Sequence, residues 1–281
     1  MKKRAKNLES KQPIYAQLTE FYARIRRAQE ESRNTLSLPS FQFHQAERAG
    51  EFQEGFPLFN KAEMPVDIPS AVALFSNLCT ITRETNEKLK QSVTAVEQAL
   101  DQGTLNLKDL LRQYFDEAYS DTVALRQGID QAVLRFLVHM SIFPSLSALA
   151  QQIRDSVDTK NWLRGYCPVC GSLPRISFLK DEGRRFFLCS FCSSEWQSER
   201  LKCPFCENSD HKSLHYFYAE GDEAVRVDLC ERCKHYIKTV DTRKLSSPPD
   251  LNLEDITTIH LDILARDRGF SRPESPPWGF Q

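Results

Sequence analysis

The chain has 281 residues and a formal net charge of −1, and 27% of its residues are charged and 41% hydrophobic. This composition is typical of a soluble globular protein, and the length suits two domains. No stretch approaches the ~20 apolar residues that a membrane-spanning helix needs, so we expect no membrane span.

The N-terminal region predicts a helix. Residues 1–33 are basic, with nine Lys or Arg against four Glu. Apolar residues recur at helical spacing, which predicts an amphipathic helix from Pro13 to about Arg33: Tyr15, Leu18, Tyr22 and Ile25. We interpret the basic charge as a solvated helix face rather than as a nucleic-acid-binding surface.

The composition of residues 36–65 predicts an irregular segment that packs against the rest of the fold. Prolines interrupt it at positions 39, 57 and 65. It also carries five phenylalanines: Phe41, Phe43, Phe52, Phe56 and Phe59. Disordered linkers are poor in aromatic residues, so we expect this segment to be held in place, with short helical turns in it.

Helical periodicity resumes at Asp67 and continues to Val157. Gly103 is a natural stop for one helix, and we expect Pro144 to end another before a last helix follows. Cys79 and His139 lie in apolar helical patterns, which favours a buried thiol and a core histidine over metal ligands. The helical part has no paired acid and base, phosphate loop or nucleophile motif, so we expect a support without an active site, and a protein that is not an enzyme.

Four Cys-x-x-Cys pairs organise the second half of the chain within 67 residues: Cys167/Cys170, Cys189/Cys192, Cys203/Cys206 and Cys230/Cys233. The two sulfurs of such a turn, called a knuckle, converge on one ion, and two knuckles supply the four thiolates of a tetrahedral site. Pairing neighbours in order predicts two four-cysteine sites. The rival is an interleaved pairing that joins the first knuckle to the third.

A metal explains these cysteines better than disulfides or a redox dithiol. The chain begins Met1-Lys-Lys-Arg-Ala-Lys-Asn with no apolar run behind the charges, so we do not expect export to a disulfide-forming compartment. Eight thiols kept for metal imply a reducing compartment. Four thiolates suit both zinc and iron, and they leave no coordination position open for the water of a hydrolytic metal.

Hairpin patterns lie between the knuckles. The strand-like runs 175–180 and 184–188 flank a turn with Gly183, and the runs 213–219 and 224–229 flank a second turn. Knuckle, hairpin and knuckle is the plan of a zinc ribbon or a rubredoxin, and here it is duplicated.

We therefore expect an α+β fold, in which an N-terminal all-helical domain precedes two tandem four-cysteine lobes of the rubredoxin-like or zinc-ribbon type. The expected segments are 1–162 for the helical domain, 163–200 and 201–245 for the two ribbons, and 246–281 for a C-terminal helix and extended tail. The second ribbon should close with a strand at 235–240. Apolar spacing places the last helix at 255–267.

The sequence around the cysteines resembles a known family. Four runs carry the resemblance: Gly165-Tyr-Cys-Pro-Val-Cys-Gly-Ser-Leu-Pro174, Leu188-Cys-Ser-Phe-Cys-Ser-Ser-Glu-Trp196, Arg200-Leu-Lys-Cys-Pro-Phe-Cys206 and Asp228-Leu-Cys-Glu-Arg-Cys-Lys-His-Tyr-Ile-Lys238. Together they resemble the FdhE-type accessory (maturation) proteins of formate dehydrogenase. The tail from Leu261 to Phe270 is also similar, so the resemblance covers the whole chain in order.

The resemblance implies a cytoplasmic, non-catalytic protein that is needed to make active respiratory formate dehydrogenase. Its partner would be the molybdenum- or tungsten-containing catalytic subunit, bound before twin-arginine export. The resemblance also implies two metal ions, rubredoxin-type iron or zinc. By position it makes all eight cysteines the ligands.

Two other functions stay open, a rubredoxin-like electron carrier and a nucleic-acid-binding zinc ribbon. Residues 160–241 contain 13 Lys or Arg and 12 Asp or Glu. A ribbon that binds phosphates should be clearly basic, so this balance disfavours nucleic acid as a partner. The sequence leaves open whether the chain forms a homo-oligomer.

We expect the partner protein to bind on the ribbons. Side chains just after a knuckle often lie on the outer surface, and aromatic residues and arginine are enriched at interface hot spots. These criteria select four residues: Trp196, Arg200, Arg232 and Tyr236. The alternative is that the two aromatic residues fill the space between the lobes. If alanine at both Arg200 and Arg232 leaves binding unchanged, the segment around Phe52 and Phe56 is the next candidate.

Overall fold

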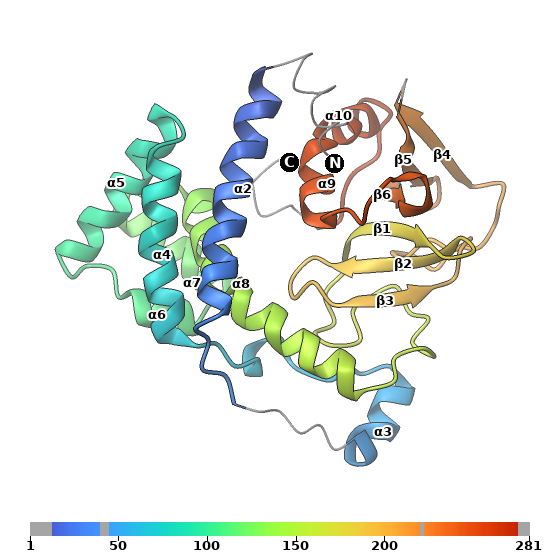
Figure 1. Cartoon of the computed structure of the whole chain (residues 1–281), viewed down its shortest axis with the longest axis horizontal. Coiled ribbons are helices and arrows are strands. Elements are labelled where there is room, and N and C mark those ends of the chain that lie inside the picture. Colours follow the sequence, from blue (N-terminus) through green and yellow to red (C-terminus); the bar gives the residue numbers. More distant parts are fainter. Residues whose placement is uncertain (1–12, 40–44, 220–221, 275–281) are drawn as a thin grey trace. The chain divides into compact units, whose positions relative to one another are not determined.

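The computed structural model describes residues 13–39, 45–219 and 222–274. These fall into two compact units (Figure 1). The helical unit contains residues 20–39 and 60–152, and the sheet unit contains the remaining described residues. The expected α+β class, with a helical N-terminal region before a strand-rich region, is confirmed. The four segment boundaries drawn from the sequence stay a prediction.

Short polar side chains cap the N-termini of four helices in the helical unit. The side chains of Asp67, Asn86, Asn106 and Asp116 each accept a hydrogen bond from a backbone N–H of the following turn, which satisfies one of the free donors at a helix start. The helices that follow these caps are α4 (Ile68–Arg83), α5 (Glu87–Asp101), α6 (Leu107–Arg112) and α7 (Glu117–Gln127).

The expected first helix is present as α2 (Pro13–Arg33), whose later part belongs to the helical unit. Its apolar residues Tyr22 and Ile25 are buried, as the periodicity predicts. Cys79 on α4 is also buried, and burial raises the pKa of its thiol to about 12. His139 is half-buried, and its ring centroid lies 6.2 Å from that of Phe143.

The prediction that Pro144 ends a helix is wrong. Pro144 lies inside α8 (Gln131–Ser156), a continuous helix of 26 residues. A proline has no N–H to donate, so the carbonyl of Met140, four residues earlier, loses its helical partner. The buried Gln29 side chain supplies a replacement, because its Nε2 donates to the Met140 oxygen at 2.9 Å.

Because α8 is continuous, the expectation that no stretch reaches membrane-spanning length also needs correction. Among the described residues α8 is the one helix long and apolar enough to cross a membrane, and 72% of its most apolar window is buried inside the protein. Such burial is usual for the core helix of a globular fold.

The aromatic-rich segment 36–65 contains more regular structure than the sequence predicts. It holds the helix α3 (Gln45–Glu54) and a short 3-10 turn at Lys61–Glu63. Phe41 and Phe43 lie outside the described residues. Within the sheet unit, the Phe52 ring stacks on Trp162 at 4.6 Å between centroids, and Phe59 is buried. The prediction that this segment packs against the fold is therefore confirmed for these two residues.

The two expected hairpins form. The first ribbon gains a third strand that was not expected, and the strand expected to close the second ribbon is present. The first ribbon contains β1 (Pro174–Lys180), β2 (Arg184–Cys189) and β3 (Glu195–Ser198), and the second contains β4 (Leu214–Ala219), β5 (Asp222–Cys230) and β6 (His235–Asp241). Gly183 has a φ of 89°, as expected for the β1–β2 turn.

The two ribbons share one sheet, which the sequence does not predict. The strand order is β3-β2-β1-β6-β5-β4, and all neighbours are antiparallel except β1 and β6 (Figure 1). The parallel β1–β6 pair, with Ser177 opposite Thr239, joins the ribbons. The strands β3 and β4 therefore form the two edges of the sheet.

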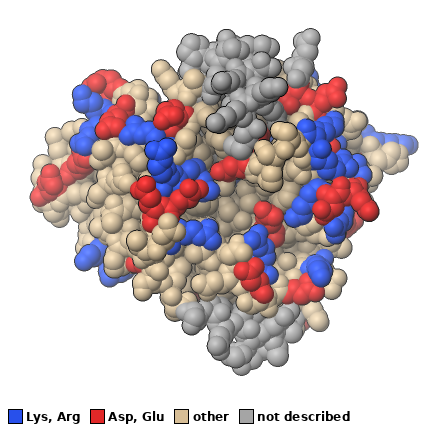
Figure 2. All heavy atoms as spheres, in the orientation of Figure 1, with Lys and Arg blue, Asp and Glu red and all other residues tan. Residues whose placement is uncertain are grey.

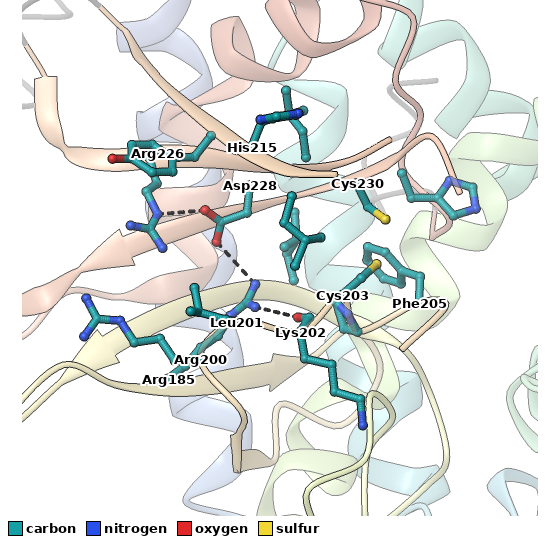
Figure 3. A pocket seen from close by; sticks show the side chains of 16 residues that line it. Arg185, Arg200, Leu201, Lys202, Cys203, Phe205, His215, Arg226, Asp228 and Cys230 are labelled. Atoms are coloured by element: carbon teal, nitrogen blue, oxygen red, sulfur yellow. Dashed lines mark hydrogen bonds and ion pairs between the residues drawn. The ribbon is translucent and has the colours of Figure 1, made fainter. Parts of the chain in front are cut away.

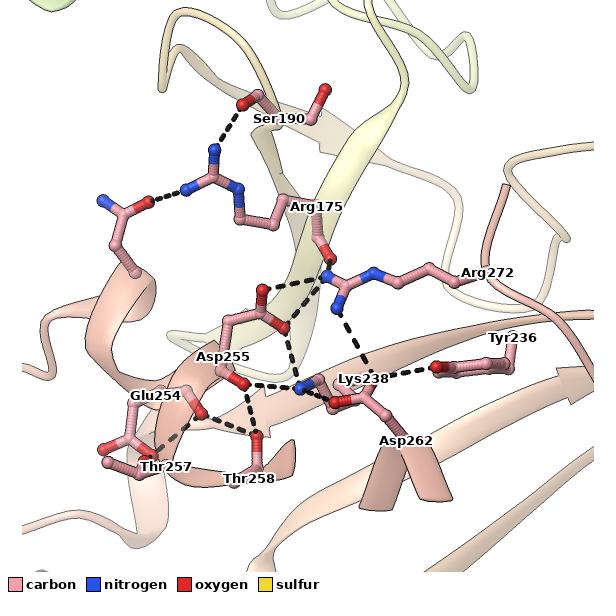
Figure 4. Close-up of polar contacts among 11 residues, drawn as sticks. Arg175, Ser190, Tyr236, Lys238, Glu254, Asp255, Thr257, Thr258, Asp262 and Arg272 are labelled. Carbon is pink, nitrogen blue, oxygen red and sulfur yellow. Dashed lines mark hydrogen bonds and ion pairs between the residues drawn. The ribbon is translucent and has the colours of Figure 1, made fainter. Parts of the chain in front are cut away.

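Two short helices, α9 (Leu251–Thr257) and α10 (Ile259–Asp267), cover one face of this sheet, where a single helix was expected. Their apolar side chains join those of the strands in one core: Ile176, Phe178, Leu188, Val225, Val227, Leu229, Tyr236, Val240, Leu261, Ala265 and Phe270. A buried ionic network also ties them to β6, since the Lys238 Nζ lies 2.9 Å from Asp255 and 2.6 Å from Asp262 (Figure 4). Trp278 in the expected tail lies outside the described residues.

Candidate metal centres

The first group of four cysteines is fully buried. Cys167 and Cys170 precede β1, and Cys189 and Cys192 lie at the end of β2 and in the turn after it. The four sulfur atoms all lie within 4.8 Å of one another. The Sγ atoms are 3.7 Å apart for Cys167 and Cys192 and 3.4 Å apart for Cys170 and Cys189.

The second group has the same geometry but is more open. Its four sulfur atoms also lie within 4.8 Å of one another, with 3.7 Å between Cys203 and Cys233 and 3.6 Å between Cys206 and Cys230. Cys203 and Cys230 are buried, whereas Cys206 and Cys233 are only half-buried. The knuckles thus meet in sequence order, and the interleaved alternative is excluded.

All four knuckles repeat one backbone turn. In each of them the residue directly after the second cysteine has a positive φ: Gly171 (73°), Ser193 (56°), Glu207 (58°) and Lys234 (57°). In three of the knuckles, the backbone N–H of the first cysteine donates a hydrogen bond to the carbonyl oxygen five residues later. One example is the 2.8 Å bond from Cys167 to Ser172. The left-handed residue turns the chain sharply enough to bring both sulfurs to the same side.

Both groups fit a tetrahedral ion. Metal–sulfur bonds of ~2.3 Å at tetrahedral angles place the sulfurs about 3.8 Å apart. The measured separations of 3.4–3.7 Å lie close to this value. Four thiolates complete a tetrahedral coordination shell, so a bound ion would hold the knuckles together rather than activate water.

The thiols have strongly perturbed proton affinities. Burial raises the pKa of Cys167 and Cys192 well above the usual value. In the more open group, burial opposes ionisation of Cys230, but hydrogen bonds from the Cys233 N–H and the Asn208 side chain outweigh it and lower the pKa to about 7. Four adjacent thiolates repel one another, so a cation is needed to ionise a whole group together.

The two aromatic residues selected as partner contacts lie inside the protein. Trp196 on β3 is 1% exposed, and its Nε1 donates to the Arg164 carbonyl at 3.0 Å. Tyr236 on β6 is 3% exposed, and its hydroxyl donates to Asp262 at 2.8 Å. Their rings are therefore not on the outer surface, because strand alternation directs them into the fold. Arg200 and Arg232 are exposed, and their role in partner binding stays a prediction.

Arg185 on β2 is a residue that the sequence reasoning missed (Figure 3). Its buried guanidinium comes from the first ribbon and contacts the second on both sides of the cysteine group. It donates to the carbonyl of Lys202 at 2.9 Å and lies 3.3 Å from Asp228. Lys202 directly precedes Cys203 and Asp228 stands two residues before Cys230, so Arg185 positions both knuckles. No local motif marks it, because its partners are far away in the sequence.

Comparison with known proteins identifies relatives of this chain. The family model described as "FdhE, central domain" matches residues 166–200, and "FdhE, C-terminal domain" matches residues 201–277. The chain is 36% identical over 162 residues to a "Protein FdhE homolog" of Aquifex aeolicus, covering 56% of each chain. It is 34% identical over 121 residues to "Protein FdhE" of Salmonella paratyphi B, covering 42% of this chain and 38% of the relative. The chain thus matches about half of these curated relatives' length or less.

A solved structure shares the fold. The crystal structure of the FdhE protein from Pseudomonas aeruginosa superposes with a TM-score of 0.70 over 98% of this chain and 92% of that chain. The sequence identity is 20%, so this likeness concerns the architecture. The two matched family models together contain all eight knuckle cysteines.

Proposed function

Because the chain belongs to the FdhE family, we propose that it is an accessory protein for the production of active formate dehydrogenase. The observation that carries this proposal is the match of the FdhE models to both cysteine groups. The closed coordination that four thiolates provide supports a binding role rather than catalysis.

The client in this proposal is the catalytic subunit of formate dehydrogenase, bound in the cytoplasm before export. Each cysteine group holds one metal ion, iron or zinc, and the ion stabilises a ribbon that is too small for a core of its own. The sheet unit then presents a rigid surface to the client. The surface in Figure 2 is consistent with a protein client, since basic and acidic side chains are interspersed on this face of the described residues.

A pull-down of the catalytic subunit by the full-length chain tests this proposal. Wild-type protein with its metal content intact is expected to retain the subunit. The variant Cys203→Ser/Cys206→Ser should lose most of this binding, because the second ribbon loses its ion. Absence of binding by the metal-loaded wild type would overturn the proposal.

A rubredoxin-like electron carrier is the second candidate, and one observation favours it. Cys206 and Cys233 are half-buried, so an iron ion in the second group would lie near solvent and near an electron-transfer partner. A visible spectrum that bleaches and returns reversibly during an anaerobic redox titration would support this candidate. A colourless zinc protein would eliminate it.

A further inference from the structure

A pocket of about 230 Å³ opens beside the second cysteine group, within the sheet unit (Figure 3). Its strand residues Tyr216, Arg226 and Asp228 alternate with the residues that pack against α9 and α10. Because side chains alternate along a strand, this pocket lies mainly on the opposite face of the sheet. The loop that links the two ribbons, from Arg200 to Phe205, forms its other wall.

The floor of the pocket carries an excess of positive charge. The guanidinium groups of Arg185 and Arg226 share one carboxylate, since Asp228 lies 3.3 Å from the first and 2.7 Å from the second. Within the described part of the chain, this carboxylate also accepts a hydrogen bond of 2.6 Å from the uncharged Thr239 hydroxyl. Two cations against one anion leave one positive charge in a partly desolvated place.

Arg200 adds a second positive charge at the rim. Its side chain is exposed, and no acidic group lies within ion-pair distance of it among the described residues. The neighbouring Lys202 does have acidic partners, because Glu199 and Glu207 lie 3.3 Å and 3.8 Å from its Nζ. The cationic end of the pocket therefore lies at Arg200 and Arg226.

The cysteines occupy the other end of the pocket. Figure 3 shows Cys203 and Cys230 on the side away from Arg200 and Arg226. With a divalent ion, four thiolates would leave the group a net charge of about −2. A negatively charged ligand would be repelled from that end, so it would bind between the two arginines.

The mouth of the pocket has the features of a peptide-binding edge. Strand β4 is at the edge of the sheet, so one side of its backbone pairs with no strand among the described residues. Tyr216 on β4 is 60% exposed and Leu201 is 68% exposed. The Arg226 guanidinium lies 4.9 Å from the centroid of the Tyr216 ring, which holds the cation beside this edge. An extended peptide can add to such an edge through main-chain hydrogen bonds and place a side chain in an adjoining pocket.

We propose that this surface binds an extended acidic segment of the client, with a carboxylate received between Arg200 and Arg226. This inference rests on the proposed function, and it names the surface and the chemistry of the segment recognised. The edge of β4 supplies main-chain pairing, the exposed Tyr216 and Leu201 supply apolar contact, and the two arginines select negative charge.

Charge reversal at two exposed arginines tests this surface. Arg200→Glu lies in the pocket wall, whereas Arg126→Glu makes the same change of charge at an exposed position on α7, outside the pocket lining. The affinity of each full-length, metal-loaded variant for the catalytic subunit is measured by biolayer interferometry. We expect Arg200→Glu to weaken binding about tenfold or more, and Arg126→Glu to stay within about twofold of wild type. The effect of Arg200→Glu should shrink at high salt, since exposed charges are screened.

The outcomes separate this inference from the proposed function. If wild-type protein binds the subunit and Arg200→Glu binds equally well, the pocket is not the binding surface although the proposed function stands. A larger effect of Arg126→Glu than of Arg200→Glu also overturns the pocket as the binding surface. If the wild type does not bind at all, both proposals fall.

A photo-crosslinking residue gives a second readout that does not depend on affinity. It is placed at Tyr216 on the edge strand β4 and, as a control, at Leu125 on α7, which is 71% exposed and thus at least as accessible. We expect Tyr216 to crosslink to the catalytic subunit, and mass spectrometry to find an Asp- or Glu-rich peptide in the product. Crosslinks from position 125 alone, or to a basic peptide, would contradict the proposed surface.

Discussion

Single residues decide where this chain departs from regular structure. The four knuckles each need one residue in the left-handed region, yet only Gly171 among them is a glycine. Ser193, Glu207 and Lys234 adopt the same backbone against their preference. A bound ion can offset such strain, because its binding energy is available only when both sulfurs of a knuckle face it.

Gln29 and Pro144 form a compensating pair within the helical unit, and their coupling is testable. Replacing Gln29 by Leu leaves the buried Met140 carbonyl without its donor, so the free energy of unfolding should fall by about 1–3 kcal/mol. In a Pro144→Ala background the helix can supply its own N–H to that carbonyl. The cost of Gln29→Leu should then be smaller by about 1 kcal/mol. Urea unfolding of the four proteins measures this difference, and equal costs in both backgrounds would disprove the coupling.

Asp67 predicts a specific pH dependence. Burial opposes its ionisation, but hydrogen bonds from the Ser37 and Ser70 N–H groups and from the Ser70 hydroxyl outweigh this and lower its pKa. A lowered folded-state pKa contributes stability that is present above the unfolded-state value of about 3.9 and is lost as the pH falls through the folded-state value.

The variant Asp67→Asn tests that contribution, because its amide keeps an acceptor but cannot ionise. We expect the wild type to be more stable by about 1 kcal/mol above pH 5, and the difference to shrink below about pH 4. Protonation of the cysteines destabilises both proteins alike, so the difference between them reports on Asp67. A difference that stays constant down to pH 3 would argue against a lowered pKa.

At the scale of elements, the two ribbons are structurally linked, whereas tandem metal-binding modules can fold side by side without sharing a sheet. The parallel β1–β6 pair makes one sheet of them, and Arg185 from the first ribbon holds both knuckles of the second. The helices α9 and α10 then cover the sheet across the junction, with contacts to β1, β5 and β6.

The buried ionic network beneath α9 and α10 leads to a testable prediction at this scale (Figure 4). Lys238 and Asp255 have fully buried side chains, and Arg272 lies 2.9 Å from Asp255. Lys238→Met removes one cation from two buried carboxylates, so it should reduce the free energy of unfolding by about 3–5 kcal/mol. The matched control Arg184→Met breaks an exposed pair with Asp181 and should cost less than about 1 kcal/mol.

Urea unfolding followed by tryptophan fluorescence compares these two variants. Similar small effects for Lys238→Met and Arg184→Met would mean that the network does not fix the C-terminal helices to the sheet.

The elements that the sequence predicts well are those specified by local signals. The knuckle spacing predicts both cysteine groups and their pairing in order, and the strand-like runs on either side of the Gly183 turn predict the first hairpin. The β1–β6 pairing is not predictable in this way, because it joins strands about sixty residues apart without a turn between them. The continuity of the helix through Pro144 is not predictable for the same reason. The side chain that donates a hydrogen bond to the free Met140 carbonyl comes from α2, over a hundred residues away in sequence. The burial of Trp196 and Tyr236 likewise follows from the strand register rather than from their distance to a cysteine.

At the scale of the whole molecule, the matches to the FdhE family models lie in the cysteine-rich half of the chain. The helical unit contributes a core and capped helices, and no metal-ligating group was found in it among the described residues. All candidate ligands lie in the sheet unit, where the knuckles bring them together in sequence order. The central claim is therefore that each ribbon has its own four-cysteine centre. Under the proposed function, these two centres organise the surface that binds the client.

The number of metal ions per chain tests this claim most directly. Elemental analysis of anaerobically purified full-length protein should find two ions per chain. The variant in which Cys167, Cys170, Cys189 and Cys192 are all Ser should keep one ion, since its second group is intact, and the corresponding variant of the second group should do the same. Loss of both ions from a variant that still has native helical content would contradict separate centres, and a metal-free wild type would contradict the account as a whole.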